Sequence, residues 1–403
     1  MVRIEDYTPI VGSTEIDSIR ELTEHVKGAK VVHINATPFG GGVAEILNCI
    51  VPLAKSVGID AIWQTIKGET DFFLTTKKIH NALQGDNTVE LTEDMMRVYL
   101  GTNRSNASQL DLDGEVVVIH DPQPLPLIEG GREGKWVWRC HIDTSSPNTK
   151  VWSLINGYIK KYDAVIFSLE RYVPRDLSKM RVLIDYPTID PLSAKNAPLS
   201  TGEIQKVLDR YDVDPDRPIV GQVARFDPWK NPLGAIDVYR RVKEKIPNLQ
   251  LLMIGSFAND DLDGVEWHKK AVKYAGSDRD VHILTNLDGV LNKEVNAFQR
   301  SLSVALQLSI REGFGLTVTE ALWKGVPVVG TKAGGITLQV IDGVTGYLVE
   351  SLEKAAESTE LLIRRPWLAR ELGHAGMQHV RLNFLITKGL KNYLRMHIEL
   401  VGK

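Results

Sequence analysis

The sequence predicts an α/β protein built from two doubly wound parallel sheets. Short β-branched runs alternate with segments whose apolar residues recur at helical spacing, and this rhythm is typical of parallel strands joined by crossover helices. The turn-rich segment 186–198 interrupts the rhythm once, after which it restarts. The length of 403 residues allows two to three units at about 150 residues per domain. We therefore predict two domains, residues 1–215 and 216–380.

The elements of the first domain follow in order from this pattern. Apolar residues at helical spacing between positions 16 and 26 predict a helix that ends before Gly28. The run 30–35 predicts a strand, and the segment 43–57 predicts the next helix. Further strands are predicted at residues 60–66, 115–120, 136–142 and 164–167.

The second domain follows a predicted helix over residues 201–211. Its strands are predicted at residues 218–223, 249–254, 281–284, 304–308 and 327–329. Ligands bind beyond the carboxyl ends of the strands in open parallel sheets. We therefore expect the functional residues on the loops after the strands, with the site in a cleft between two facing domains.

Composition and charge exclude several classes of protein. Lys and Arg number 48 against 51 for Asp and Glu, so no basic surplus is available for a nucleic-acid backbone. No apolar stretch reaches the roughly 18 residues of a membrane-spanning helix. The first residues lack the pattern of a secretory signal, and Cys49 and Cys140 are interpreted as reduced, buried thiols. We expect a cytoplasmic protein without a nucleic-acid or membrane partner.

The most informative segment is 309–320, between a predicted strand and a predicted helix. Its glycines allow the backbone to approach a ligand closely, and the helix N-terminus favours phosphate. Glu312 and Glu320 flank this turn, which consists of Gly313, Phe314, Gly315, Leu316 and Thr317. The segment predicts an anion cradle between two carboxylates, with a capped turn that binds nothing as the alternative.

A second loop, 224–231, follows the first strand of the second domain and so lies at the same rim of the sheet. Arg225 and Lys230 are five residues apart on this loop and carry enough positive charge to neutralise a diphosphate. Taken alone, the two cations are more often solvated loop residues. Together with the glutamate-flanked cradle they predict a site for a leaving group.

The first domain offers a glycine loop and two histidines. Segment 37–45 begins like a dinucleotide fingerprint, but Glu45 stands where the third glycine is expected, which disfavours a nicotinamide cofactor. Contact of Gly41 and Gly42 with a diphosphate or a sugar fits better. His120 and His141 each end a predicted strand, and although a lone histidine is more often structural, this rim is where ligands bind.

The sequence offers no convincing metal site. Two Asp-x-Asp patterns, 111–113 and 261–263, are interpreted as turns rather than as metal ligands. We therefore expect that the protein has no metal ligands and requires no cofactor. Mg²⁺ would at most stimulate its function.

The two glutamates separated by seven residues around Gly-Phe-Gly resemble the signature of the retaining glycosyltransferases of the GT-B fold, family four. The resemblance covers essentially the whole chain. Segments 39–45, 120–124 and 295–300 narrow it to the trehalose glycosyltransferring synthases of thermophilic archaea and bacteria. It implies two facing Rossmann-like domains, with a final helix over residues 384–401 so that residues 381–403 return to the first domain.

The resemblance also implies an activity. The donor would be a nucleoside-diphosphate glucose such as UDP-glucose or ADP-glucose, the acceptor free glucose and the product α,α-trehalose. The acceptor hydroxyl would attack the anomeric carbon from the face that the diphosphate leaves, and a phosphate oxygen would take the proton. The protein would stabilise the leaving group electrostatically and would need no nucleophile of its own.

Site residues follow by position in the matched motifs. Arg225 and Lys230 would hold the diphosphate. Glu312 would contact the donor sugar, and His141 would lie near the transferred sugar. The other donor-binding residues would be Gly41, Gly42, Thr285, Asn286, Gly313, Phe314, Gly315, Leu316, Thr317 and Glu320, with Glu320 at the ribose and Thr285 and Asn286 near the base. The acceptor would be bound by His120, Asp121 and Gln123.

Departures from the family pattern and rival functions remain open at this point. Ser303 stands where an aspartate is usual and Thr337 where a proline is commoner, which concerns substrate preference more than activity. The alternatives are a trehalose phosphorylase, another retaining family-four glycosyltransferase and a non-enzymatic nucleotide-sugar sensor. The base of the donor, the physiological direction and the oligomeric state, including a homodimer, are undetermined by the sequence.

Overall fold

The computed structural model describes residues 2–39, 41–131, 133–257 and 262–402, which form two compact units. The first comprises residues 1–187 and 386–403, and the second residues 188–385. The sequence-based boundary at 215 differs from this division because segment 188–215 packs with the second unit. There, Asn296 Nδ2 donates to the carbonyl oxygens of Ala194 (3.0 Å) and Ala197 (2.8 Å).

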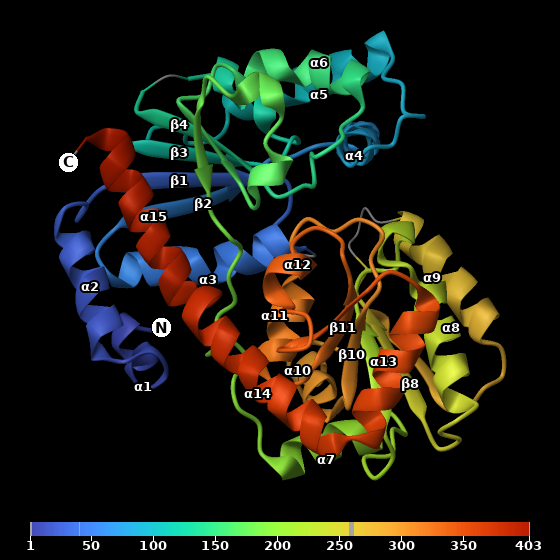
Figure 1. The fold of residues 1–403 in the computed structure, drawn as a ribbon. Coiled ribbons are helices and arrows are strands. Elements are labelled where there is room, and N and C mark those ends of the chain that lie inside the picture. The colour runs from blue at the N-terminus through green and yellow to red at the C-terminus, as the bar shows by residue number, and fades with distance from the viewer. Residues whose placement is uncertain (1, 40, 132, 258–261, 403) are drawn as a thin grey trace. The chain divides into compact units, whose positions relative to one another are not determined.

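The first unit is a parallel sheet covered by helices on both faces (Figure 1). Its strand order is β2-β1-β3-β4-β5-β6. The strands are β1 Lys30–Asn35, β2 Asp60–Thr65, β3 Val116–His120, β4 Lys135–Cys140, β5 Ala164–Phe167 and β6 Arg181–Ile184. The helices are α1 Thr8–Val11, α2 Ser13–Glu24, α3 Gly42–Ser56, α4 Thr70–Leu83, α5 Glu93–Ala107, α6 Thr149–Ile159 and α15 Ile386–Val401.

The second unit has the same architecture, with strand order β12-β11-β10-β7-β8-β9 and all neighbours parallel. The strands are β7 Ile219–Val223, β8 Gln250–Gly255, β9 Val281–Thr285, β10 Val304–Gln307, β11 Val328–Thr331 and β12 Gly346–Val349. The helices are α7 Thr201–Arg210, α8 Pro232–Lys243, α9 Leu262–Ala275, α10 Asn292–Ser301, α11 Leu316–Trp323, α12 Ile336–Gln339, α13 Leu352–Arg364 and α14 Pro366–Asn383.

The predicted α/β class is confirmed. The predicted strands 30–35 and 164–167 coincide with β1 and β5, whose apolar residues are buried. Strands β6 and β12, which lie at sheet edges and are only partly buried, were not predicted. The edge strands β2 and β9 are also only partly buried, yet segments 60–66 and 281–284 were predicted as strands, so an edge position does not by itself explain the two that were missed.

The predicted helix 201–211 and the two cysteines can also be compared with the structure. Helix α7 begins where a capping box forms, with Ser200 Oγ accepting the amide of Glu203 (3.3 Å) while a Glu203 oxygen accepts the amide of Ser200 (3.1 Å). Cys140 is buried as predicted, but Cys49 is only partly buried, and neither forms a disulfide among the described residues.

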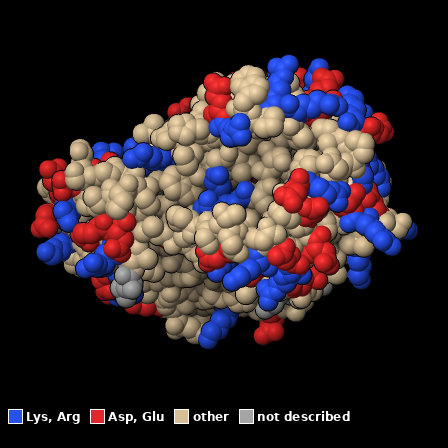
Figure 2. All heavy atoms as spheres, turned by 90° about the horizontal axis from the view of Figure 1, so that it is seen from below, with Lys and Arg blue, Asp and Glu red and all other residues tan. Residues whose placement is uncertain are grey.

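Helix α15 returns to the first unit and packs on α2 and α3. Its buried residues recur at helical spacing along one face and include Leu390, Tyr393, Leu394 and His397. Among the described residues, no helix combines the length and the apolar character needed to cross a membrane. On the face drawn in Figure 2, Lys and Arg lie interspersed with Asp and Glu.

Two glycines on α14 let this helix approach α11 closely. A Cβ at Gly373 would lie 1.9 Å from the carbonyl oxygen of Gly325, and one at Gly376 would lie 2.7 Å from Leu322 Cδ2. Leu322 is part of α11, and Gly325 follows that helix. Because α11 carries Glu320 and begins at the Gly-Phe-Gly turn, this contact sets the position of the helix on which the predicted anion cradle depends.

We predict that Gly373→Ala lowers the free energy of unfolding of the second unit. Alanine favours a helix by roughly 0.5–1 kcal/mol over glycine, but its Cβ would overlap a backbone oxygen, and overpacking costs about 1–3 kcal/mol. Gly101→Ala in α5 is the matched control, since a Cβ there meets nothing within 4 Å. Urea denaturation should show a loss for Gly373→Ala and none for Gly101→Ala. Equal stability of the two variants would contradict the packing argument.

Candidate functional site

The loop after β7 presents Lys230 in a defined direction. Asp227 Oδ1 accepts the amide of Lys230 (3.1 Å), which closes the short 3-10 helix η5 (Pro228–Lys230). Gln222 Nε2, on β7, donates to the carbonyl oxygen of Lys230 (2.7 Å). Asn231, with a φ of 52°, then caps α8. The amide and the carbonyl group of Lys230 are thus both hydrogen-bonded, which fixes the backbone from which its side chain extends.

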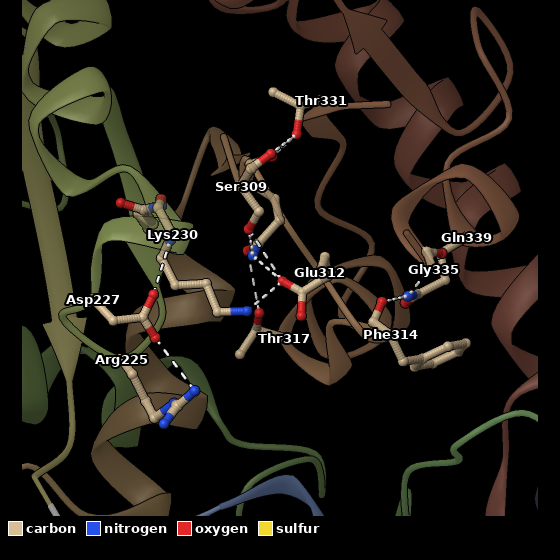
Figure 3. A network of polar contacts seen from close by, with 12 residues as sticks. Arg225, Asp227, Lys230, Ser309, Glu312, Phe314, Thr317, Thr331, Gly335 and Gln339 are labelled. Carbon is tan, nitrogen blue, oxygen red and sulfur yellow. Dashed lines mark hydrogen bonds and ion pairs between the residues drawn. The ribbon is translucent and has the colours of Figure 1, made fainter. Parts of the chain in front are cut away.

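Lys230 contacts Glu312 at the centre of the second unit's site (Figure 3). Lys230 Nζ lies 2.7 Å from Glu312 Oε2, and the two side chains are only 15% and 6% exposed. The same oxygen accepts from Gln307 Nε2 (3.0 Å) and Ser309 Oγ (3.1 Å). A buried carboxylate is costly unless it is paired and hydrogen-bonded, and here three donors converge on one oxygen.

Arg225 lies on the same loop and is better exposed. Its Nη2 is 3.3 Å from Asp227 Oδ2, and its side chain is 41% exposed. The guanidinium therefore keeps donors directed to solvent, where a ligand can reach them. Lys230 and Arg225 thus extend from one loop, the first engaged with Glu312 and the second accessible (Figure 3).

The Gly-Phe-Gly turn connects this pair to α11. Gly315 has a φ of 84°, a conformation that favours glycine. A Cβ at this position would lie only 3.2 Å from Glu312 Cγ, so the glycine leaves room for the Glu312 side chain. Phe314 is held through its carbonyl oxygen, which accepts from Gln339 Nε2 (2.6 Å). Thr317 Oγ1 donates to Gln307 Oε1 (3.2 Å). Helix geometry leaves the first amides of α11 without acceptors inside the helix, so they can bind an anion.

Glu320 lies one helical turn beyond and is buried in a separate network. Its Oε1 is 3.0 Å from Lys195 Nζ, and its Oε2 accepts from Gln299 Nε2 (3.0 Å). Lys324 Nζ donates to Asn196 Oδ1 (2.8 Å), and burial lowers the pKa of Lys324 to about 7. Each Glu320 oxygen has a cationic or amide donor already, and each retains a lone pair for a hydroxyl.

The two residues predicted near the base lie at the carboxyl end of β9. Thr285 is buried, and its hydroxyl both donates to Asp288 Oδ2 (2.8 Å) and accepts the amide of Leu287 (3.2 Å). Asn286 exchanges two hydrogen bonds with the backbone of Phe257 (2.8 and 3.3 Å). Both side chains are therefore engaged in hydrogen bonds that shape the turn after β9.

In the first unit, three histidines form a continuous row. His120, the last residue of β3, lies with its Nε2 3.0 Å from His33 Nδ1 on β1 and its Nδ1 3.1 Å from His141 Nε2. Burial lowers the pKa of all three imidazoles, and nearby Arg139 lowers them further. The rings are therefore neutral at physiological pH.

Asp121 follows His120 in a strained conformation with a φ of 63°. Its Oδ1 accepts the amide of His141 (2.8 Å), which ties the ends of β3 and β4 together. Burial raises the pKa of Asp121 to about 7, against the opposing effect of that hydrogen bond. Gln123 lies two residues further on, with its Oε1 buried and without a hydrogen-bond partner among the described residues.

The glycine loop and the Asp-x-Asp patterns have simple local structures. Gly41 and Gly42 are exposed at the start of α3, and Gly41 accepts the amide of Glu45 (3.1 Å). Lys30 Nζ lies 2.9 Å from Asp111 Oδ2 and 3.8 Å from Asp113 Oδ2. Asp261 lies outside the described residues. The described part of the chain contains no cluster of three or more His, Cys, Asp or Glu suited to a metal.

Both sets of residues occupy the switch point of their sheet, where strand order reverses and ligands bind in such folds. In the second unit, β7 and β10 are neighbours, and their loops carry Lys230 and Glu312. In the first unit, β1 and β3 are neighbours and carry His33 and His120. The structure thus brings together Arg225, Lys230, Glu312 and Thr317 in one unit, and His120, His141 and Asp121 in the other.

Several residues of these clusters were not predicted. Gln307 and His33 lie inside strands, where a polar residue in an apolar run was the available signal. Lys195 lies in the turn-rich segment before α7, and nothing local to its sequence connects it with Glu320. The position of Tyr393 next to His33 is decided by the packing of α15 and carries no local signal.

Comparisons with known proteins identify the family of the chain and support its fold. Residues 33–174 match the family described as trehalose synthase, N-terminal domain, and residues 204–379 match glycosyl transferases group 1. A solved α,α-trehalose 6-phosphate synthase from Burkholderia multivorans superimposes with a TM-score of 0.72 at 16% identity, covering 93% of this chain and 99% of that one. Fold and site together define a glycosyltransferase of the GT-B class.

Whole-chain relatives narrow the class. The trehalose synthase of Thermococcus litoralis is 52% identical over 97% of this chain and 96% of its own length, and that of Pyrococcus horikoshii 50% identical over 99% and 97%. A trehalose phosphorylase from Grifola frondosa is 28% identical over 89% of this chain but 55% of its own length. The chain belongs to the trehalose synthase family.

We predict that Asp121→Asn changes how stability depends on pH. The folded protein keeps the proton of Asp121 up to a pKa of about 7, whereas the unfolded chain loses it near the ordinary value of 3.8. The free energy of unfolding of the wild type should therefore fall, relative to the variant, as pH rises from about 4 to about 7 and stay level above that. The slope is limited to about 1.4 kcal/mol per pH unit.

Denaturant titrations at several pH values measure this difference. Asp212→Asn is the matched control, because it also places asparagine at a positive φ (55°), on an exposed residue. A constant difference between wild type and Asp121→Asn over this pH range would refute the prediction.

Proposed function

We propose that this protein is a retaining glucosyltransferase that forms α,α-trehalose from a nucleoside-diphosphate glucose and free glucose. The contact between Lys230 and Glu312 at the carboxyl ends of β7 and β10 carries the proposal. It brings together a cation, a carboxylate that could accept hydrogen bonds from sugar hydroxyls, and the N-terminus of α11 at one switch point. The names of the whole-chain relatives support trehalose as the product.

The donor half of the reaction would depend on charge. Arg225 and Lys230 would bind the diphosphate oxygens, and the amides at the start of α11 would bind them from the other side. An ammonium group has three donors, so Lys230 can keep its contact with Glu312 and still reach a phosphate. Negative charge grows on the diphosphate as the bond to the anomeric carbon breaks, and these groups stabilise it there.

Glu312 would hold the donor sugar through hydroxyl groups. One of its oxygens already accepts from three protein donors, which fixes the orientation of the carboxylate. Glu320, held by Lys195 and Gln299, would accept from the ribose hydroxyls. The two glutamates would therefore bind two different sugars of the same donor.

The acceptor half would depend on neutral groups in the first unit. His141 would face the transferred sugar, with His120, Asp121 and Gln123 toward the acceptor. The unsatisfied Oε1 of Gln123 is suited to accept from a sugar hydroxyl. The acceptor O–H bond would break, its oxygen would bond to the anomeric carbon, and the proton would pass to an oxygen of the departing diphosphate.

We predict that the purified protein forms a non-reducing disaccharide from glucose and at least one of UDP-, ADP- and GDP-glucose. The reaction should proceed in the presence of EDTA, because Arg225 and Lys230 supply the charge that a divalent ion supplies elsewhere. Chromatography with a trehalose standard, together with detection of the nucleoside diphosphate, measures both products. A reducing disaccharide as product would overturn the proposal.

Phosphorolysis is the second candidate, favoured by the similarity to the Grifola frondosa enzyme. Incubation of trehalose with either inorganic phosphate or a nucleoside diphosphate separates the two reactions. We expect glucose release with the nucleoside diphosphate alone. Release with phosphate alone would assign the chain to phosphorolysis.

We predict that Arg225→Ala and Lys230→Ala each lower kcat by about 10²-fold, by comparison with the loss of one preorganised donor to a developing negative charge. Lys293→Ala is the control, since Lys293 forms an exposed ion pair with Glu203. Lys230→Ala also leaves Glu312 without its cation, so its thermal stability must be measured alongside turnover. Near-normal turnover in both site variants would reject the assigned roles.

A further inference from the structure

The row of histidines in the first unit continues to a tyrosine on the last helix. His33 Nε2 lies 3.2 Å from the hydroxyl of Tyr393 in α15, His33 Nδ1 lies 3.0 Å from His120 Nε2, and His120 Nδ1 lies 3.1 Å from His141 Nε2. We call these four residues the histidine relay. His33, His120 and Tyr393 are buried, while His141 at the end of the row is partly exposed.

The ring geometry makes these contacts hydrogen bonds rather than stacked faces. The centroids of His120 and His141 are 5.4 Å apart and the ring planes differ by 13°. The two nitrogens are 3.1 Å apart, much closer than the two ring centroids, so each nitrogen lies on the side of its ring that faces the other ring. The rings therefore meet edge to edge. The pair of His33 and His120 has a similar separation of 5.3 Å.

Proton counting leaves the relay two states. A neutral imidazole has one N–H donor and one acceptor nitrogen, and burial keeps all three rings neutral. Every N–H in the row must then point the same way. Either Tyr393 donates to His33 and the row ends with a proton on His141 Nδ1, or His141 Nε2 donates inward and the row ends at the tyrosine oxygen.

The environment of Tyr393 selects between these states. Within the described part of the chain, the Tyr393 hydroxyl forms one side-chain hydrogen bond, to His33. In the inward state the tyrosine oxygen accepts from His33 and its own buried O–H lacks an acceptor, which carries the cost of an unsatisfied buried donor. In the outward state that O–H is satisfied. The outward state, with the proton on His141 Nδ1, is therefore lower in free energy.

We propose that Tyr393, His33 and His120 are positioning residues that hold His141 in the Nδ1–H tautomer, so that it presents a hydrogen-bond donor to a hydroxyl oxygen of the sugar. The role at a sugar rests on the proposed function, whereas the tautomer is a property of the free protein. Helix α15, which packs on the first unit, would then have a functional role, because it supplies the Tyr393 hydroxyl that sets the direction of the hydrogen bonds in the relay.

Nitrogen NMR of the full chain labelled with ¹⁵N-histidine tests the tautomer without any substrate. The spectrum of a His141→Gln variant identifies the signals of His141 among those of the ten histidines. In the wild type we expect His141 to carry its proton on Nδ1. In Tyr393→Phe the relay loses its fixed donor, and the Nε2–H form of His141 should become populated. A proton on Nε2 in the wild type, or an unchanged tautomer in Tyr393→Phe, would overturn the proposal.

Two further variants keep the test decisive. Tyr162→Phe removes another buried hydroxyl of the first unit, which donates to Leu125 (2.6 Å), and it should leave the His141 signals unchanged. His33→Phe interrupts the relay at the residue next to Tyr393 and should give the same spectral change as Tyr393→Phe. It serves as the test if Tyr393→Phe does not fold. A spectral change in Tyr162→Phe equal to that in Tyr393→Phe would reduce the effect to general destabilisation and reject the relay.

Kinetics connect the tautomer to the proposed function. Tyr393→Phe should lower kcat for trehalose formation about threefold to tenfold, the effect of one weakened hydrogen bond, while the KM for the nucleotide sugar stays nearly constant. If the wild-type protein forms no trehalose, the proposed function is rejected, whereas the tautomer measured by NMR still stands. A normal kcat in a Tyr393→Phe variant with an altered His141 tautomer would refute the role of the relay at the sugar.

Discussion

Glu312 imposes the constraint on which the rest of the second unit's site depends. A carboxylate with a side chain only 6% exposed must be matched by donors, and these come from Lys230, Gln307 and Ser309. Lys230 is placed by the loop after β7, and Gln307 by β10. One buried charge thus couples two neighbouring strands and fixes the loops that end them, and the glycine turn at the start of α11 closes around it.

The candidate site residues of the two units satisfy their buried polar groups in different ways. In the second unit, charges are paired, as in Lys230 with Glu312 and Lys195 with Glu320. In the first unit, burial and Arg139 keep the histidines neutral, and they satisfy one another in a row. Paired charges suit a diphosphate that gains negative charge, whereas neutral donors and acceptors suit sugar hydroxyls. This division matches the proposed roles of donor and acceptor.

Much of the fold could be predicted because covered parallel strands leave a distinct mark in the sequence. The strands 30–35 and 164–167 were predicted to the residue, and the predicted helix 201–211 begins where α7 begins. Strands β6 and β12 were missed, although the other two edge strands, β2 and β9, were predicted. The candidate site shows the same pattern: the motifs with Glu312 and Lys230 were visible, and the partner Gln307 was hidden as a single polar residue inside an apolar strand.

The sequence by itself determined the α/β class, the two-domain organisation, the glutamate motif and the cations of the neighbouring loop, because each depends on residues close together in the chain. The tertiary structure alone decided which oxygen of Glu312 Lys230 meets, that Lys195 pairs with Glu320, and that Tyr393 reaches His33 across 360 positions of sequence. Such contacts depend on how whole helices and strands pack. A buried charge or hydroxyl without a partner is costly, so burial makes these contacts necessary, but local spacing does not record which residues will meet.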